Sequence, residues 1–559
     1  MFSLNIFFFF FFFFFFFFFF GVYFYEYDVI FFFEWLIFSL NSCSFSCILF
    51  FDWISLIFMS FVFLISGSVF FYSIGYMSDD LFFVRFFFFV FFFVLSMIFF
   101  ILMPDLICML LGWDGLGLVS YCLVIYYQNK VSLYSGLITV FMNRFGDVFL
   151  ILCIGWFLNF GSCHFFFYIN FFDYDFFVII YLVLFASFTK SAQFPFCFWL
   201  PAAMAAPTPV SSLVHSSTLV TSGVYLIIRF NYYIFYMNTY FLMFISLLTM
   251  FISGFNACVE NDLKKIIAFS TLSQLGFMFF ILSFGSLILC FIHLLIHAVF
   301  KSLLFLCSGF FIHCFFGNQD IRFMGGLSIQ CPYISSCFCI SLMCLCGFPF
   351  FSGFYSKDFV LEMVVLMEMG YLYFFFFLFS VSLTIFYSFR LLYYLFFSNS
   401  FFFCFISFKY CFYMNFSLFF LFFFSLFGGS LIFWLFMDFV FIVDYFLKFM
   451  PLFIFFFSLF YCFDFLNGFF FYCNIFYFHF FGSMWFLNYF TSNFFLFRFF
   501  KFSYFSYNIV DVGWLEYFVS GGLIGFLNWI SYFFEKFNLS IFYIYMISFF
   551  FFFFFMYFL

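Results

Sequence analysis

The sequence predicts an all-α polytopic membrane protein, because its residues are too apolar for a soluble fold. Of its 559 residues, 69% are hydrophobic and only 7% are charged, and the mean hydropathy is +1.28, whereas soluble domains carry about 25% charged residues. A helix that crosses the hydrocarbon core needs about 20 apolar residues, so this length accommodates about fifteen such helices. The net charge of −7 is modest and indicates no nucleic-acid partner.

Short polar or Gly- and Pro-containing breaks separate the apolar segments. The first segment lacks the basic n-region and the small-residue cleavage site of a signal peptide, so we expect a retained helix. The expected spanning segments lie near residues 5–24, 52–76, 82–103, 105–127, 131–159, 176–203, 209–235, 238–259, 262–284, 286–314, 331–369 (interrupted), 371–398, 411–437, 449–472 and 540–559.

Loop charges support this count. Lys and Arg residues concentrate in alternate loops of a membrane protein, on the cytoplasmic or matrix side. In this chain most of them lie in or next to the even-numbered loops, counted from the N-terminus. This places those loops and the N-terminus on the cytoplasmic or matrix side. The basic residues concerned are Arg85, Lys130, Lys264, Lys265, Arg322 and Lys409. Arg229 and Lys448 are exceptions, because both belong to odd-numbered loops.

Phe supplies 146 residues, including an unbroken run from Phe7 to Phe20. Lipid-facing positions require only apolarity, so a mutational bias toward T-rich codons explains this run better than an aromatic function, and it indicates an organellar genome. The 20 cysteines are scattered through apolar segments without a C-x-x-C pair. They are typical of small core residues, so we expect no metal, iron–sulfur cluster or other cofactor in this chain.

Three lysines lie inside stretches that are otherwise apolar enough to cross a membrane: Lys190, Lys301 and Lys357. A charge at the bilayer centre costs roughly 2.5–3.5 kcal/mol on insertion scales, so such residues usually mark a path for ions or protons. The sequence therefore indicates charge movement through a membrane rather than chemistry on a soluble substrate.

Two of these lysines lie beside helix breakers. Lys190 precedes Pro195 by five residues, and Pro349 precedes Lys357 and Asp358 in a Gly-containing stretch. Proline removes a backbone hydrogen bond, and discontinuous helices of this kind line ion sites in transporters. The repeated pattern suggests an internal duplication. The alternative for each lysine is a side chain that reaches toward the membrane surface near a helix end.

His293, His297 and Lys301 recur every four residues and therefore share one face of one helix. Histidine titrates near neutrality, so this face can pass protons with water between its members. The rivals are a pair of satisfied core histidines and a haem or metal pair. The latter is disfavoured, because His215 and His313 form no matched pair and the HLLIH segment lacks the Glu of a zinc hydrolase.

Asp114 lies among glycines in the middle of an expected helix. An acid there is costly unless it pairs with a base such as Lys190. On the next helix Arg144 and Asp147 are three residues apart and can pair with each other. His215 lies in a hydroxyl-rich segment that either holds water or bonds neighbouring helices.

Six motifs together resemble the subunit 5 family of NADH dehydrogenase, the distal antiporter-like proton-pumping subunits of respiratory complex I. The resemblance covers roughly residues 50–400 and keeps the family order. The motifs are LGWDGLGLVSY, NRFGD, KSAQFPFCFWLPAAMAAPTPVSSLVHSSTLVTSGVYL, DLKKIIAFSTLSQLGFM, HLLIHAVFKSLLFLCSG and GFPFFSGFYSKD.

The resemblance implies two inverted helical repeats, a lateral helix and a final anchor. The domains that we expect are N-terminal helices and a loop over 1–81, a first repeat over 82–235, a second over 236–398, additional helices over 399–504, a lateral amphipathic helix over 505–537 and an anchoring helix over 538–559. One further spanning pair is the alternative for the polar, aromatic stretch 473–537.

The resemblance also implies roles for individual residues. Asp114 stands at the acid of the pump pair, Lys190 at the lysine of the broken helix and His215 at a bridging histidine. The central polar axis of the family passes through Lys264 or Lys265, together with His293, His297 and Lys301. Lys357 stands at the distal lysine.

Three departures from the family pattern stand out. The family acid is usually Glu, and Asp114 shortens its reach by one methylene. Ala202 stands where bacterial members often carry an acid, which fits a mitochondrial type. Only one helix precedes Phe51, whereas the family typically has two.

The expected function is proton translocation in the membrane arm of NADH:ubiquinone oxidoreductase, in the mitochondrial inner membrane. NADH, FMN, iron–sulfur clusters and ubiquinone are expected in partner subunits. The expected partners are other membrane-arm subunits, above all the neighbouring antiporter-like one, and membrane lipids. The alternatives are a subunit of a multi-component Na⁺/H⁺ antiporter and a membrane-arm scaffold that does not pump.

Overall fold

The computed structural model describes residues 2–40, 43–160, 164, 174–234, 239–367, 370–399, 411–437, 441–466, 475–487, 489–490 and 496–558. The chain divides into two compact units, Met1–Trp485 and Phe486–Leu559. Lys409, one of the loop charges considered above, lies outside the described residues.

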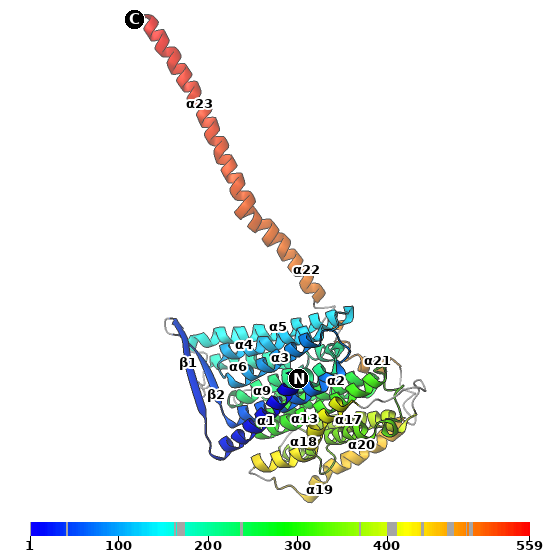
Figure 1. The fold of residues 1–559 in the computed structure, drawn as a ribbon. Coiled ribbons are helices and arrows are strands. Elements are labelled where there is room, and N and C mark those ends of the chain that lie inside the picture. Colours follow the sequence, from blue (N-terminus) through cyan, green and yellow to red (C-terminus); the bar gives the residue numbers. More distant parts are fainter. Residues whose placement is uncertain are drawn as a thin grey trace. The chain divides into compact units, whose positions relative to one another are not determined.

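The first unit is a bundle of helices with one β-hairpin (Figure 1). Its long helices are α1 (Phe2–Glu26), α2 (Trp53–Tyr76), α3 (Phe83–Leu102), α4 (Leu106–Val124), α5 (Lys130–Phe157), α6 (Tyr174–Lys190), α9 (Leu219–Arg229), α11 (Thr239–Val259), α12 (Leu263–Ser283), α13 (Leu287–Cys314), α15 (Pro332–Cys346), α16 (Ser352–Leu366), α17 (Tyr371–Leu392), α18 (Phe412–Phe436) and α20 (Met450–Leu466). Shorter turns connect them: η1 (Leu158–Phe160), α7 (Trp199–Ala202), η3 (Ala203–Ala205), α8 (Thr208–Leu213), η4 (Val214–Thr218), α10 (Asn231–Ile234), α14 (Leu327–Gln330), η5 (Tyr393–Phe397), α19 (Tyr445–Lys448) and α21 (Ile475–Gly482).

The helical membrane fold is confirmed. Within the described residues, 12 helices are long and apolar enough to cross a membrane. Three shorter apolar helices, Phe177–Lys190, Pro332–Cys346 and Met450–Cys462, correspond to further expected segments. The total of about fifteen spans stays a prediction, because these three fall below the length of a full span.

The core of the bundle lies around α2, α12 and α13. Their most apolar windows are 100%, 100% and 89% buried, whereas that of α1 is only 22% buried. A helix that is apolar on every side is stable only when it is buried in protein or lipid. In α1, Phe7, Phe10 and Phe14 pack inward, while Phe8 and Phe12 are exposed. The Phe run therefore supplies one packed face and one face of the kind that lipid accepts.

A β-hairpin occupies the connection between α1 and α2, which the sequence analysis treats as a loop. Strands β1 (Phe31–Leu40) and β2 (Cys43–Phe51) pair antiparallel, from Phe31 opposite Phe51 to Leu40 opposite Cys43. Aromatic residues suit a pleated, half-buried surface, and both strands are rich in them. Strand β2 also contacts α2 and α3.

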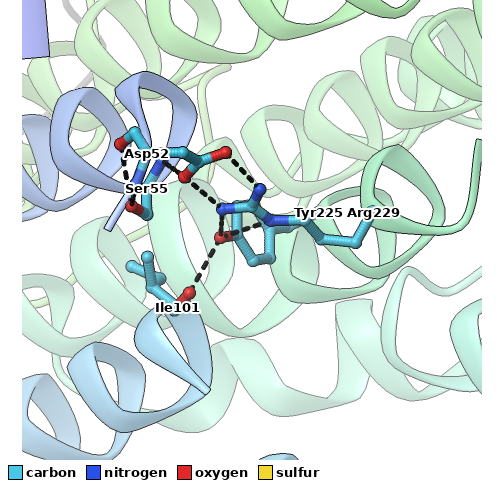
Figure 2. Close-up of polar contacts among 5 residues, drawn as sticks. All are labelled: Asp52, Ser55, Ile101, Tyr225 and Arg229. Atoms are coloured by element: carbon cyan, nitrogen blue, oxygen red, sulfur yellow. Dashed lines mark hydrogen bonds and ion pairs between the residues drawn. The ribbon is translucent and has the colours of Figure 1, made fainter. Parts of the chain in front are cut away.

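A buried ion pair ties the start of α2 to the end of α9 (Figure 2). Asp52 caps α2 through a reciprocal pair of hydrogen bonds with Ser55. Arg229 donates two hydrogen bonds to this carboxylate, at 2.6 and 2.9 Å. Arg229 also donates to the Tyr225 hydroxyl, which in turn donates to the Ile101 carbonyl oxygen at 2.9 Å. We call this group the Asp52–Arg229 clamp.

The clamp explains why Arg229 is an exception among the loop charges. Both charged side chains are less than one-tenth exposed, so the carboxylate neutralises the arginine inside the protein. Burial alone would raise the pKa of Asp52. The positive charge of Arg229 and the hydrogen bonds from Arg229 and Ser55 outweigh burial and lower that pKa below its ordinary value.

The second unit is a helical stretch. Helix α22 (Leu496–Ser506) continues through the wide π-helical turns η8 (Tyr507–Leu515) and η9 (Tyr517–Gly521) into α23 (Gly522–Phe558). No break marks position 538, where the sequence analysis places the boundary between a lateral helix and an anchor. That division, like the other domain boundaries, stays a prediction.

Candidate functional site

The break predicted at Pro195 is present. Helix α6 ends at Lys190, and the next helical turn, α7, begins at Trp199. Helix ends leave carbonyl groups without partners, and inside a membrane these must be satisfied by protein groups or water. The Trp199 indole donates to the Thr189 carbonyl oxygen at 2.9 Å, and the Ser191 hydroxyl donates to the Ser187 carbonyl oxygen at 2.6 Å.

Lys190 is fully buried at the end of α6. Its Nζ atom donates to the Trp113 carbonyl oxygen at 2.7 Å and lies 4.4 Å from the centre of the Trp113 ring. The Trp113 indole donates to Asp147 Oδ1 at 2.9 Å. One tryptophan therefore links the lysine of the broken helix to a carboxylate on α5.

The expected ion pair between Asp114 and Lys190 is not formed. Instead, Arg144 Nη1 lies 3.8 Å from Asp114 Oδ2 and 3.0 Å from Asp147 Oδ2. The pair of Arg144 with Asp147 is confirmed, and Arg144 takes Asp114 as well because its guanidinium lies between the two carboxylates. Asp114 therefore lies beside Arg144 rather than in an ion pair with Lys190.

His215 lies in the π-helical turn η4, between α8 and α9. π-Helical turns are rare and often occur at functional sites. The His215 ring is buried, and neither of its nitrogens has a hydrogen-bond partner within the described part of the chain. A buried imidazole of this kind normally bonds water.

Within the described part of the chain, the hydroxyl groups around His215 donate to their own segment rather than to neighbouring helices, the latter being one of the two expectations. Each donates to a carbonyl oxygen three to five residues earlier in its own helical segment. The residues are Ser211, Ser212, Ser216, Ser217 and Thr218. Such local bonds satisfy a hydroxyl in an apolar interior and compete with regular helix geometry, in keeping with the irregular turn.

The adjacent Lys264 and Lys265 have different environments. Lys264 is buried, and its Nζ atom donates to the Ala206 carbonyl oxygen at 3.1 Å. Lys265 pairs with Asp262 at 2.7 Å, and 42% of its side chain is exposed. Of the two candidates for the polar axis, only Lys264 therefore lies inside the bundle.

His293, His297 and Lys301 lie on α13, as predicted, and all three are fully buried. His293 is held on both sides, with Nδ1 2.9 Å from the Ser356 hydroxyl and Nε2 3.2 Å from Gln274 Oε1. The ring centres of His293 and His297 are 6.4 Å apart.

The other two members of this face have fewer contacts. Neither ring nitrogen of His297 has a partner among the residues that the structure places. Lys301 donates to the Ser270 hydroxyl on α12. The face thus consists of one histidine bonded on both sides, one buried histidine whose ring nitrogens have no partner among the described residues, and one lysine bonded to a neutral oxygen.

The second predicted break is also present. Helix α15 ends at Cys346 and α16 begins at Ser352, with Pro349 between them. Lys357 lies on α16, is buried, and donates to the Leu345 carbonyl oxygen in the last turn of α15. The lysine therefore satisfies a carbonyl that the break has freed.

A cavity adjoins Lys357, with about 40 Å³ of space for water. Its lining includes Pro349, Lys357, Asp358, Gln274 and Thr384. A buried water needs at least about 10–15 Å³ of such space and two to four polar partners, so this cavity can hold one or a few waters. It brings together Gln274, which contacts His293, and Lys357 of the second break.

Sequence reasoning missed several amides of this interior. Gln193 accepts a hydrogen bond from the Thr249 hydroxyl at 2.8 Å, Gln274 contacts His293, and Asn143 is buried near Lys190. A neutral amide attracts less attention than a charge in an apolar segment. A buried amide nevertheless requires partners, so Gln and Asn inside expected spans are the signal that could have identified them.

Comparisons with known proteins cover almost the whole chain. Residues 103–384 match the family model for the transmembrane region of NADH:quinone oxidoreductase/Mrp antiporters. Residues 35–87 match the model for the N-terminus of NADH-ubiquinone oxidoreductase (complex I) chain 5. Residues 387–559 match the model for the C-terminus of NADH dehydrogenase subunit 5. NADH-ubiquinone oxidoreductase chain 5 of Aedes aegypti is 47% identical, covering 89% of this chain and 87% of the relative. That of Locusta migratoria is 45% identical, covering 89% and 88%.

The chain belongs to the NADH-ubiquinone oxidoreductase chain 5 family. The resemblance stated from the motifs is thereby confirmed. Among solved structures, the Mrp complex from Dietzia sp. DQ12-45-1b is similar with a TM-score of 0.67 and 22% sequence identity, covering 77% of this chain and 50% of that chain. At this identity the likeness concerns the fold, and it confirms the antiporter-like architecture.

Proposed function

We propose that this chain conducts protons across the mitochondrial inner membrane as a membrane-arm subunit of NADH:ubiquinone oxidoreductase. Electron transfer from NADH through FMN and iron–sulfur clusters to ubiquinone belongs to partner subunits in this proposal. The observation that carries it is the set of four buried lysines on neutral oxygens: Lys190, Lys264, Lys301 and Lys357.

None of these four lysines takes part in an ion pair within the described part of the chain. A buried ammonium without a counter-charge is costly, so the charge of each lysine depends strongly on its neighbours. This dependence is what a proton carrier requires, because a nearby change of charge can then load or unload the lysine.

The cluster of Asp114, Arg144 and Asp147 provides such a nearby change. In the structure Arg144 holds both carboxylates, and Trp113 connects Asp147 to Lys190. A shift of Asp114 toward Lys190 would stabilise the charged lysine, and its return to Arg144 would favour release of the proton. The proton then passes by Lys301 and the histidines of α13 toward Lys357.

The same cluster indicates where a partner subunit binds. The side chains of Arg144 and Asp114 are 46% and 31% exposed, although both lie in spanning helices. Charged groups in a membrane normally face the interior of a bundle or a water-filled cavity rather than lipid. A neighbouring membrane-arm subunit that covers this face of α4 and α5 would shield them, and we propose an antiporter-like subunit for this position.

The test is NADH-driven proton pumping in membrane vesicles that carry Lys190→Ala, at matched complex assembly. We expect fewer protons pumped per electron, because the lysine of the first broken helix is lost. Lys265→Ala is the control, since this lysine is half-exposed and pairs with Asp262. Unchanged pumping in Lys190→Ala would make the chain a scaffold, and assembly into a complex without quinone activity would favour a cation antiporter.

A further inference from the structure

His293 has two hydrogen-bonding partners on two other helices. Its Nε2 atom lies 3.2 Å from the amide oxygen of Gln274 on α12, and its Nδ1 atom lies 2.9 Å from the hydroxyl oxygen of Ser356 on α16. All three side chains are buried. An amide oxygen only accepts hydrogen bonds, so the arrangement requires a proton on Nε2 of the histidine.

In the neutral ring Nδ1 is then an acceptor, and the Ser356 hydroxyl donates to it. The same hydroxyl has a second acceptor within reach, the Gly353 carbonyl oxygen of its own helix, at 3.3 Å. Ser308 on α13 is closer to the corresponding oxygen, that of Phe305, at 2.8 Å. Because O–H···O bonds are normally 2.5–3.0 Å long, the longer distance at Ser356 agrees with a hydroxyl proton that points to His293.

The protonated ring can use the same partners. Nε2–H still donates to Gln274, and Nδ1–H donates to the Ser356 oxygen once the Ser356 hydroxyl has turned toward the Gly353 carbonyl oxygen. A buried donor or acceptor without a partner costs about 1–3 kcal/mol. Rotation of one hydroxyl therefore keeps both ring nitrogens bonded in either charge state of His293.

We propose that Ser356 is a hydroxyl switch through which His293 takes up and releases a proton, and that Gln274 is the positioning residue that fixes the ring. This inference rests on the proposed function, in which protons pass by the histidines of α13. It adds to that pathway two neutral residues, one on α12 and one on α16, which hold the ring between them.

The proton step conserves all atoms. Because Ser356 lies against Nδ1, an incoming proton reaches the ring through the serine oxygen. One N–H bond breaks on an ammonium of the pathway and an O–H bond forms on Ser356, while the original O–H bond of Ser356 breaks and an N–H bond forms at Nδ1. The ammonium ends as a neutral amine and the ring as an imidazolium. Ser356 keeps one hydroxyl proton, which turns to Gly353, and release of the proton reverses these steps.

The sharpest test is Ser356→Ala. This substitution removes the hydroxyl and little volume, and alanine is the best helix former, so the chain should assemble normally. Nδ1 of His293 then loses both its donor and its acceptor. We expect fewer protons pumped per electron during NADH oxidation in vesicles with matched amounts of complex. Ser308→Ala is the matched control and should pump like the wild type, because Ser308 is also buried and its hydroxyl donates within α13.

Ser356→Thr separates the switch from a packing effect. Threonine keeps the hydroxyl, which in a helix can also bond a carbonyl oxygen three or four residues earlier, so this variant should pump better than Ser356→Ala. Full pumping in Ser356→Ala, or no recovery in Ser356→Thr at matched assembly, would overturn the proposal.

Lys190→Ala distinguishes a failure of the switch from a failure of the proposed function. If Lys190→Ala lowers pumping while Ser356→Ala does not, only the hydroxyl switch is wrong. If Lys190→Ala itself has no effect, the proposed function is wrong.

Discussion

At the scale of single residues, the surroundings of a charge distinguish side chains that the sequence cannot. Lys264 and Lys265 are consecutive, and both fall in the same family motif, so the sequence left the choice open. The structure separates them because consecutive side chains of a helix point in directions about 100° apart, so that one lysine faces the interior and the other the surface. Lys264 reaches the Ala206 carbonyl oxygen in the interior, and Lys265 reaches Asp262 at the surface.

This difference predicts opposite results for two neighbouring substitutions. Lys264→Ala should reduce proton pumping per electron, because it removes a buried charge beside the segment that leads to His215. Lys265→Ala should leave pumping unchanged, since a surface ion pair contributes about 0–1 kcal/mol at most. Pumping in vesicles with equal amounts of assembled complex measures both. Equal losses in the two variants would contradict the assignment of Lys264 to the interior.

The charged members of the site were predictable and their partners were not. Lys190, Lys301 and Lys357 stand out because a charge in an apolar segment is expensive wherever the segment folds, and the structure buries all three. The partner of Asp114 depends on how α4, α5 and α6 pack, which no local pattern encodes. The sequence therefore suggested Lys190, whereas Arg144 is closer.

At the scale of elements, the two broken helices follow from their prolines, while the irregular turn at His215 does not follow from any comparable signal. Proline removes a backbone donor wherever it lies in a helix, so the breaks at Pro195 and Pro349 could be placed in advance. The π-helical turn η4 instead arises where several hydroxyls bond the backbone of their own segment. The β-hairpin was missed because its aromatic residues also suit an apolar loop or helix.

The Asp52–Arg229 clamp fixes the far end of the segment that carries His215, and its removal should destabilise the bundle. Arg229→Gln leaves the buried Asp52 carboxylate without its counter-charge, which costs about 3–5 kcal/mol when one partner of a buried pair is lost. Arg322→Gln is the matched control, because Arg322 pairs with Asp320 at the exposed surface. The measurement is thermal unfolding of the detergent-solubilised complex, with release of this chain as the signal. The unfolding temperature should decrease strongly for Arg229→Gln only.

The clamp should also weaken in acid. The pKa of Asp52 is lowered in the folded protein, so its contribution to stability is complete above the ordinary pKa of Asp, about 3.9. It is lost as the pH falls through the lowered pKa, where the carboxylate takes up a proton. If the clamp kept its full contribution to the free energy of unfolding at pH values below the lowered pKa of Asp52, this account would be contradicted.

At the scale of the whole molecule, the fold depends on the pattern of apolar segments more than on the identity of their residues. A protein of 22% sequence identity shares the architecture with a TM-score of 0.67, and this chain forms it with 146 Phe residues. Lipid-facing and core positions of a spanning helix accept many apolar side chains. The fold class could therefore be predicted from composition and loop charge, whereas the helix count depends on short, interrupted segments whose ends no composition defines.

The second unit illustrates what such a pattern can and cannot decide. Its helices expose large apolar side chains along most of their length, yet charges are present only up to Lys536, and none follows as far as Phe558. An uncharged helical segment of this length is sufficient to cross a membrane. The preceding segment carries Asp511, Glu516 and Glu535 and suits a position along the membrane surface or against protein.

This distribution of charge predicts that an added arginine is tolerated in one part of α23 and not in the other. Met546→Arg places a charge in the middle of the expected anchor, which costs about 2.5–3.5 kcal/mol at the bilayer centre, so the C-terminus should fail to cross. Tyr532→Arg is the matched control, because this exposed residue lies in the charged part of the same helix. Protease accessibility of a C-terminal tag on the full chain in sealed vesicles reports the outcome. Equal effects at the two positions would show that residues 505–537 and 538–559 share one environment, and the division between lateral helix and anchor would be wrong.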